Sequence, residues 1–207
     1  MSYLLTLLTL AGVQALAVMS PGPNFVVTAH YAITRSRRDG IFVALGIATG
    51  TTIWVSLSIA GLSVVFAQFS WIVESIRIMG ALYITLLGIR MVWMAHRQMP
   101  SRESEAVSVL QISAWQKGFL TNVSNPKTAA FFTSLFVLLL PAHPPLWFQI
   151  TCVATIVLIS ASWYILVACL FSWKPATRAY LRARKWIDTV TGGIFIAFGI
   201  YLARSKQ

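Results

Sequence analysis

Charged residues are scarce in this chain. They make up 10% of its 207 residues, whereas a soluble domain carries about 25%. Only 5 residues are Asp or Glu, while hydrophobic residues amount to 57%. So little charge cannot cover a water-soluble globule of this size, and the composition therefore excludes an ordinary soluble domain. It predicts an all-α integral membrane protein with several transmembrane helices.

Potential metal ligands and disulfide partners are also sparse. Cys152 and Cys169 lie in one apolar block without CxxC spacing, and the 3 histidines are scattered singly. We therefore expect no metal site, no other cofactor and no disulfide framework. The chain has no P-loop and no HExxH motif, which argues against ATP hydrolysis and against a zinc protease. No single apolar block holds two carboxylates either, so we expect a protein that is not an enzyme.

Long apolar runs dominate the chain. Six blocks approach or exceed the roughly 20 residues that span a bilayer. They cover residues 3–33, 40–66, 72–94, 118–140, 146–172 and 186–203. Six spans leave no room for a separate soluble domain, so we predict one transmembrane domain over residues 1–207. Its two halves are about 1–95 and 118–207, and a connection over 95–117 joins them.

Basic residues lie between the blocks, with few exceptions. Most of the 16 Lys and Arg residues fall in the first, third and fifth connections, which share one side of the membrane if all six blocks span it. Positively charged connections face the cytoplasm. We therefore predict that the connection 95–117 is cytoplasmic and that both termini lie on the other side. Because topology explains the net charge of +11, we expect no nucleic-acid partner.

Two of the blocks are interrupted by proline among polar residues. Proline lacks a backbone donor and clashes with the carbonyl four residues before it. A broken helix is tolerated at membrane depth only where protein or a water-filled cavity receives the freed backbone groups. We therefore predict two broken helices that line a cavity and bind substrate through Ser20, Pro21, Gly22, Pro23, Asn24, Asn122, Asn125, Pro126 and Lys127.

The two interruptions fall in the first block of each half. Each half has three blocks, an odd number, so a second copy must be inserted upside down. The third blocks also look alike, with Gly80-Ala81-Leu82-Tyr83 beside Gly192-Gly193-Ile194-Phe195. We predict six transmembrane helices in two inverted three-helix repeats, with the first and fourth helices broken. Paired breaks in inverted halves indicate a transporter binding site.

Lys127 is the only formal charge deep inside a block. A lysine at the bilayer centre costs about 2.5–3.5 kcal/mol on insertion scales. We therefore predict that Lys127 faces a polar cavity, where it could meet a carboxylate or exchange a proton. Asp188 opens the sixth block, and we predict that it joins Lys127 in proton coupling; pairing with Arg184, four residues earlier, is the structural alternative.

Two tryptophans and a glycine pair lie inside blocks. Trp54 and Trp163 fall near the middles of the second and fifth blocks, where they are either walls of the substrate cavity or packing aromatics. Gly46 and Gly50 form a GxxxG motif, which indicates close helix packing within the fold or between subunits. The motif therefore leaves a homo-oligomer open.

In these motifs the chain resembles the LysE/RhtB family of bacterial amino-acid exporters. The matching segments follow one another along nearly the whole chain and include Met19-Ser20-Pro21-Gly22-Pro23-Asn24, Leu45-Gly46-Ile47, Gly80-Ala81-Leu82-Tyr83, Asn125-Pro126-Lys127 and Trp186-Ile187-Asp188. Within the family the chain is most similar to the threonine-efflux branch. The resemblance implies proton-driven export of a neutral or hydroxylated amino acid, such as threonine or homoserine, across the bacterial inner membrane.

The sequence leaves one alternative to a secondary exporter. A channel or a structural membrane subunit without carrier activity would also be apolar and helical, although no filter-like TVGYG stretch occurs. For the exporter, the expected partners are an amino-acid substrate, protons and the lipid bilayer.

Overall fold

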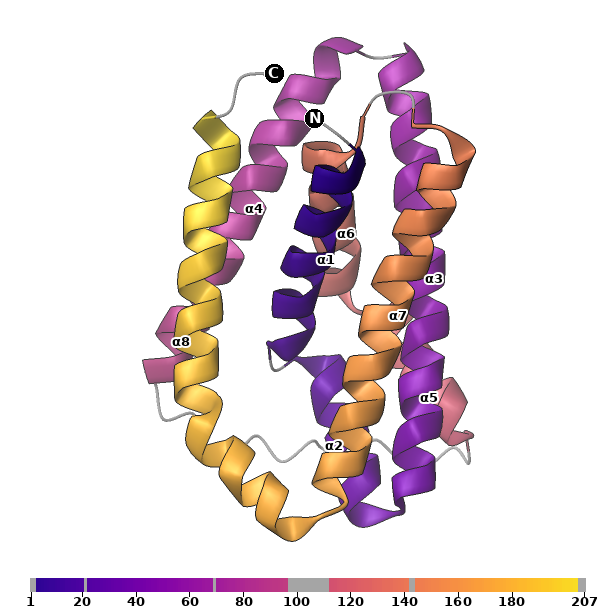
Figure 1. The fold of residues 1–207 in the computed structure, drawn as a ribbon, viewed down its shortest axis with the longest axis vertical. Helices are drawn as coiled ribbons and strands as arrows, with labels where there is room; N and C mark the ends of the chain where they lie inside the picture. The colour runs from indigo at the N-terminus through magenta and orange to yellow at the C-terminus, as the bar shows by residue number, and fades with distance from the viewer. Residues whose placement is uncertain (1–2, 21, 69, 97–111, 142–143, 205–207) are drawn as a thin grey trace.

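The computed structural model describes residues 3–20, 22–68, 70–96, 112–141 and 144–204 (Figure 1). Within these ranges every regular element is a helix, which confirms the all-α prediction. The helices are α1 (Tyr3–Met19), α2 (Pro23–Thr34), α3 (Arg37–Gln68), α4 (Ser70–His96), α5 (Ala114–Val123), α6 (Pro126–Leu139), α7 (Leu146–Phe171) and α8 (Lys174–Arg204). The start of α1 and the end of α8 lie at the same end of the bundle (Figure 1).

The first and fourth apolar blocks each fold as two helices. α1 ends at Met19 and α2 begins at Pro23, where a proline at the first helical position needs no partner for a backbone N–H. The axes of α1 and α2 are bent by 55°. In the fourth block α5 ends at Val123 and α6 begins at Pro126. The two predicted interruptions are therefore confirmed, although Pro21 itself lies outside the described residues.

The described helices differ in how well they match a membrane span. Arg37–Gly61 and Leu146–Phe171 are each long and apolar enough to cross a bilayer, and the bent pair α1 and α2 would make a third span. The apolar parts of α4 and α6 are shorter, at Ile78–Trp93 and Lys127–Leu139. The described part of the chain is therefore all-helical with two or three candidate spans, and the arrangement of six spans stays a prediction.

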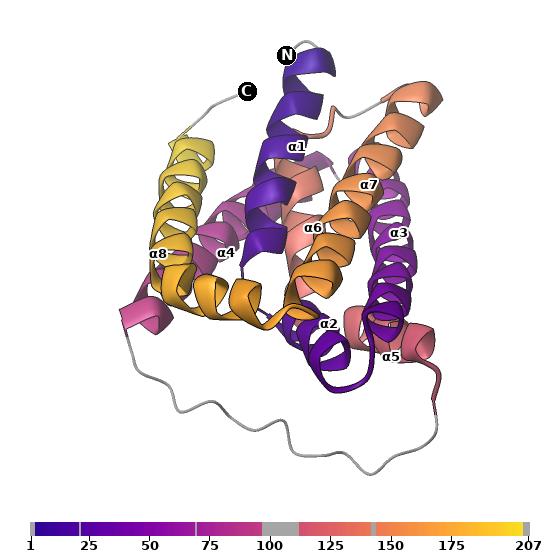
Figure 2. The ribbon, with the colours of Figure 1, turned by 60° about the horizontal axis from the view of Figure 1, so that its bottom comes forward.

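α8 begins earlier in the chain than expected. We expected residues 174–185 to be a connection, but they form the first part of this helix. Their Ala, Arg, Leu and Lys residues favour a helix even though they are too polar for a span. Figure 2 shows this part lying across one end of the bundle before the helix turns along α4. Of the predicted connection 95–117, residues 97–111 lie outside the described residues.

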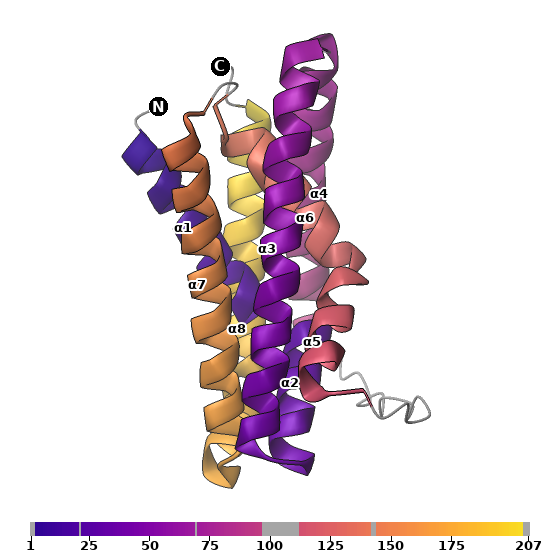
Figure 3. The ribbon, with the colours of Figure 1, turned by 90° about the vertical axis from the view of Figure 1, so that its right-hand side faces the viewer.

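The basic segments gather at one end of the molecule. The junctions between α2 and α3 and between α7 and α8, together with the start of α5, lie opposite the start of α1 (Figure 1). Figure 3 shows α5 and α6 following one another along the long axis, so the break between them lies at mid-height. The break between α1 and α2 also lies between the two ends (Figure 1).

Glycines allow α5 to pack directly on α3. A methyl carbon added at Gly46 would overlap the carbonyl oxygen of Trp115, and one added at Gly50 would lie 2.7 Å from Oδ1 of Asn122. On the other helix, a methyl carbon at Gly118 would overlap the carbonyl oxygen of Val43. The GxxxG motif therefore serves packing within the fold, and it holds Asn122 against α3.

Candidate functional site

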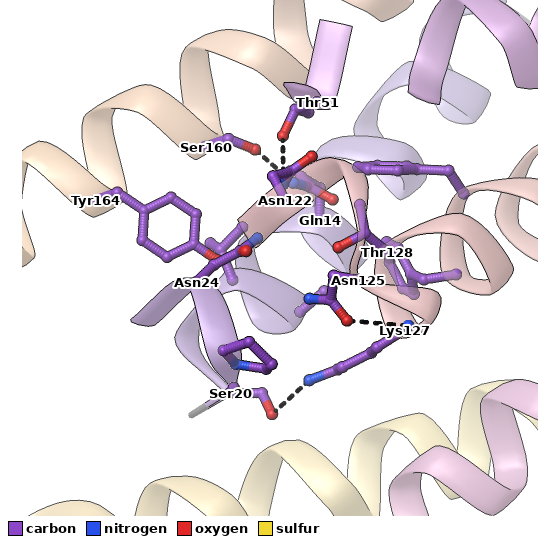
Figure 4. Close-up of a pocket in the computed structure, with 16 residues that line it drawn as sticks. Gln14, Ser20, Asn24, Thr51, Asn122, Asn125, Lys127, Thr128, Ser160 and Tyr164 are labelled. Carbon is purple, nitrogen blue, oxygen red and sulfur yellow. Dashed lines mark hydrogen bonds between the residues drawn. The ribbon is translucent and has the colours of Figure 1, made fainter. Parts of the chain in front are cut away.

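A polar pocket lies where the two helix breaks meet (Figure 4). Both interruptions contribute to its wall, together with side chains from α1, α3 and α7. The predicted site residues that line it are Ser20, Gly22, Pro23, Asn24, Asn122, Asn125 and Lys127. The fold thus brings two segments from opposite halves of the chain to one place.

Two helix N-termini border this pocket. α2 starts after Gly22, which has no side chain to cap the helix, and no side-chain cap hydrogen bond is formed there. α6 starts after Asn125, whose Oδ1 accepts a hydrogen bond from the backbone N–H of Lys127 at 3.0 Å. The first turn of a helix carries unpaired N–H groups and a partial positive charge. This side of the pocket therefore favours an anion.

Lys127 connects the two breaks. Its ammonium donates a hydrogen bond to Oγ of Ser20 at 3.1 Å, and its backbone carbonyl accepts one from the Tyr83 hydroxyl at 3.3 Å. Asp188 on α8 is buried, and its carboxylate acts electrostatically on the Lys127 ammonium. Within the described chain Lys127 therefore meets polar groups from Ser20 at the first helix break, from Tyr83 on α4 and from Asp188 on α8.

The opposite end of the pocket is built from amides and hydroxyls. The side-chain N–H of Gln14 donates to Oγ of Ser160 at 2.8 Å, and that of Asn122 donates to Oγ1 of Thr51 at 3.4 Å (Figure 4). Each of these four side chains is at most 2% exposed. The Asn24 amide lies beside the Tyr164 hydroxyl.

Three amide oxygens remain available in this part of the site. Within the described chain, Oε1 of Gln14, Oδ1 of Asn24 and Oδ1 of Asn122 are buried and accept no hydrogen bond. A buried acceptor without a donor costs about 1–3 kcal/mol. Most buried polar groups in proteins are paired, so three such oxygens in one pocket indicate a place for a ligand with several donors.

Several residues of the pocket were not predicted from the sequence. They are Gln14, Ala17, Val18, Thr51, Thr128, Phe131, Phe132, Ser160 and Tyr164. Conversely, Trp54 and Trp163 do not line the pocket, and each packs against a cluster of buried apolar side chains. A signal was present in α7, because Ser160 and Tyr164 are four residues apart and therefore share a helix face that excludes Trp163.

A second, larger cavity adjoins the polar pocket. Its volume is about 710 Å³, against about 50 Å³ for the polar pocket. α4 contributes Tyr83, Leu86 and Arg90 to its wall, while Ser20 and Lys127 belong to both cavities. Lys127 thus lies at the boundary between a small polar pocket and a wider, more apolar space.

Comparison with known proteins gives a match over almost the full length. The family model for the LysE type translocator matches residues 5–206. The chain belongs to the LysE type translocator family.

Curated relatives in this family cover the same length. The chain is 33% identical over 205 residues to the threonine efflux protein of Salmonella typhi, with 98% of this chain and 100% of the relative aligned. It is 32% identical over 209 residues to the threonine efflux protein of Escherichia coli (strain K12), with the same coverage. The uncharacterized membrane protein YahN of that strain is 31% identical over 198 residues, which cover 92% of this chain and 86% of the relative. No solved structure gives a significant match.

Membership in the LysE family agrees with the architecture. The family and these relatives are transporters and membrane proteins, and the chain carries long apolar helices with many exposed Leu and Ile side chains. This LysE family chain is therefore an integral membrane protein of a transport family. Its pocket at the two helix breaks is the candidate place for the transported molecule.

Proposed function

We propose that the chain is a secondary exporter of threonine, homoserine or related neutral amino acids from the cytoplasm across the bacterial inner membrane, driven by the proton motive force. One observation carries the proposal. The N-termini of α2 and α6 and the ammonium of Lys127 border a pocket that also holds three buried amide oxygens without donors. An amino acid presents the complementary pair of charges, a carboxylate and an ammonium.

The substrate carboxylate binds on the side of the helix breaks. Lys127 supplies a full positive charge there, and the uncapped N-terminus of α2 supplies backbone N–H donors. Ser20 now accepts the lysine's hydrogen bond at 3.1 Å and is the group that a carboxylate oxygen would replace. Charge-assisted hydrogen bonds of this kind are about twice as strong as neutral ones.

The substrate ammonium binds on the side of the amides. Its three donors match the oxygens of Gln14, Asn24 and Asn122, which accept nothing from the described residues. Ser160 and Thr51 lie beside Gln14 and Asn122 and can meet a substrate hydroxyl. This set of small polar groups supports threonine or homoserine as the substrate.

Lys127 and Asp188 are the proposed proton-coupling pair. Lys127 carries its charge while it holds the carboxylate, and Asp188 is the neighbouring acid that can exchange a proton once the substrate has left. Lysine is suited to proton coupling because its ammonium can lose a proton, whereas the guanidinium of arginine stays protonated.

The structure represents a state in which the polar pocket is closed around too little space for the substrate. The polar pocket offers about 50 Å³, enough for a few water molecules but not for an amino acid. In the transport cycle the helices around it must therefore separate. The adjoining cavity along α4 is the proposed route from the cytoplasm, since Arg90 and Lys127 both line it.

The proposed architecture is two inverted three-helix repeats, formed by α1 to α4 and α5 to α8, with the connection 95–117 in the cytoplasm. Helix packing supports this arrangement. In these repeats α1 corresponds to α5, α2 to α6, α3 to α7 and α4 to α8. The contact of α3 with α5 therefore has its equivalent in the contact of α7 with α1. Likewise, the contact of α2 with α7 has its equivalent in the contact of α6 with α3. α3 also packs on α7, and α4 packs on α8, so each of these helices meets its own counterpart. Rocking of one repeat against the other would expose the pocket to each side in turn.

Counterflow in proteoliposomes tests the proposed function. Vesicles that contain the purified protein are loaded with unlabelled threonine and diluted into a trace of labelled threonine. We expect transient accumulation of the label, because a carrier exchanges one substrate for another. A channel or a structural subunit gives no stimulation by internal substrate, and that result would replace the exporter by the alternative.

A further inference from the structure

The first part of α8 carries a row of exposed cations. Arg178, Arg182 and Lys185 are exposed and are spaced four and three residues apart, so they lie on one face of the helix. Tyr180 lies on the opposite face and packs into the bundle. Residues 174–187 contain no Asp or Glu, and the next acidic residue, Asp188, is buried.

Tryptophans on both sides of this segment indicate where it lies relative to the bilayer. Trp173 is 63% exposed and Trp186 is 74% exposed. Exposed indoles in membrane proteins concentrate at the level of the lipid headgroups. The segment also lies across the end of the bundle, whereas the following apolar part of α8 runs along α4 (Figure 2). The cations are therefore at the height of the headgroups.

Aromatic contacts connect the same segment to the helix that begins at the pocket. The Tyr180 ring stacks on Phe25 with centroids 4.9 Å apart and planes 26° apart, and it meets Phe171 at 5.2 Å. Phe25 and Phe171 are themselves 5.3 Å apart. Because Phe25 directly follows Asn24, these contacts place the first part of α8 against the start of α2, next to the pocket.

We propose that Arg178, Arg182 and Lys185 form a binding surface for the headgroups of anionic phospholipids in the adjacent leaflet. Arginine side chains suit this ligand, because their planar donors can hold two phosphate oxygens at once. The headgroup source is favoured over a soluble anion by the exposed tryptophans and by the apolar continuation of α8, where Val190 is 57% exposed and Ile194 is 42% exposed. A bound lipid can therefore place its acyl chains along that face.

Native mass spectrometry of the purified full-length protein tests this surface. The protein in detergent micelles is titrated with phosphatidylglycerol, and with phosphatidylethanolamine as a lipid without net charge, and the bound lipids are counted. The test variant is R178Q/R182Q/K185Q. The matched control is R35Q/R37Q/R38Q, which removes the same number of charges at the same end of the molecule, where α2 ends and α3 begins.

We expect the wild type to bind phosphatidylglycerol more tightly than phosphatidylethanolamine. Each removed cation on α8 should weaken binding about five-fold at low salt, so the triple variant should lose on the order of a hundred-fold. The control should lose less than about five-fold. If the triple variant does not fold, the single variants Arg178→Gln and Arg182→Gln should each lose about five-fold.

Three results would overturn the proposal. The first is equal loss in the test and control variants, which would mean that only the overall charge matters. The second is equal binding of the two lipids by the wild type. The third is displacement of phosphatidylglycerol by millimolar inorganic phosphate, which would make the ligand a free anion.

Discussion

Gly192 and Gly193 are neighbours in α8, and they should respond in opposite ways to the same substitution. A methyl carbon added at Gly192 would lie 2.7 Å from the carbonyl oxygen of Gly88 on α4. A methyl carbon added at Gly193 would meet nothing within 4 Å. Since an ordinary carbon contact needs about 3.5 Å or more, Gly192→Ala must push α4 and α8 apart, whereas Gly193→Ala needs no movement.

The difference in stability between the two variants follows from these distances. Both gain about 0.5–1 kcal/mol from replacing a helical glycine by alanine. That gain cancels in the comparison and leaves the overpacking at Gly192, which costs about 1–3 kcal/mol. For a chain of this length we expect Gly192→Ala to unfold about 2–12 °C below Gly193→Ala.

Thermal unfolding of the two purified variants in the same detergent measures this difference. Gly88→Ala provides a second check, because its methyl carbon would lie 2.5 Å from the carbonyl oxygen of Gly192. The double variant G88A/G192A should lose less than the sum of the single losses, since one separation of the helices relieves both contacts. Equal unfolding temperatures for Gly192→Ala and Gly193→Ala would refute the close packing of α4 and α8.

Three further predictions concern the pocket and the topology. Gln14→Leu removes an unpaired buried oxygen but also the donor to Oγ of Ser160, and because these two effects oppose each other the unfolding temperature should change little. Counterflow should fall at least ten-fold, and full counterflow would remove Gln14 from the site. Lys127→Arg should bind the substrate within about ten-fold of the wild-type affinity. An imposed pH gradient should no longer stimulate its efflux, because a guanidinium does not release its proton. Normal stimulation would rule out the proposed coupling role of Lys127. Single cysteines at Ser104 and Ser205, in a background without Cys152 and Cys169, should react with an impermeant thiol reagent in intact spheroplasts only at position 205, and the reverse pattern would invert the topology.

The helix breaks could be predicted from the sequence because their cause is local. Proline removes a donor and disturbs a carbonyl one turn away wherever it stands, so the interruptions around Pro23 and Pro126 did not depend on packing. The role of Lys127 as a pocket residue was equally accessible, because a lone cation inside an apolar block needs polar surroundings.

The amide side of the pocket could not be predicted from the sequence in the same way. Which face of a long apolar helix turns toward a cavity depends on its rotation within the bundle, and one residue changes the direction by about 100°. The sequence therefore does not distinguish Trp163 from its neighbour Tyr164, and it is Tyr164 that lines the pocket. The start of α8 differs from the prediction for another reason: high charge indicates a connection between spans, but Ala, Arg and Lys are also strong helix formers.

The central claim, that Lys127 binds the carboxylate of the transported amino acid, can be tested by equilibrium binding. Labelled L-threonine and L-threonine amide, which lacks the carboxylate charge, are each titrated onto the wild type and onto Lys127→Met. We expect Lys127→Met to bind threonine about 10–150-fold more weakly, as for a lost hydrogen bond between charged groups, while its affinity for the amide stays within about three-fold of the wild type. Equal weakening for both ligands would mean that Lys127 only supports the shape of the pocket, and unchanged affinity for threonine would place the carboxylate elsewhere.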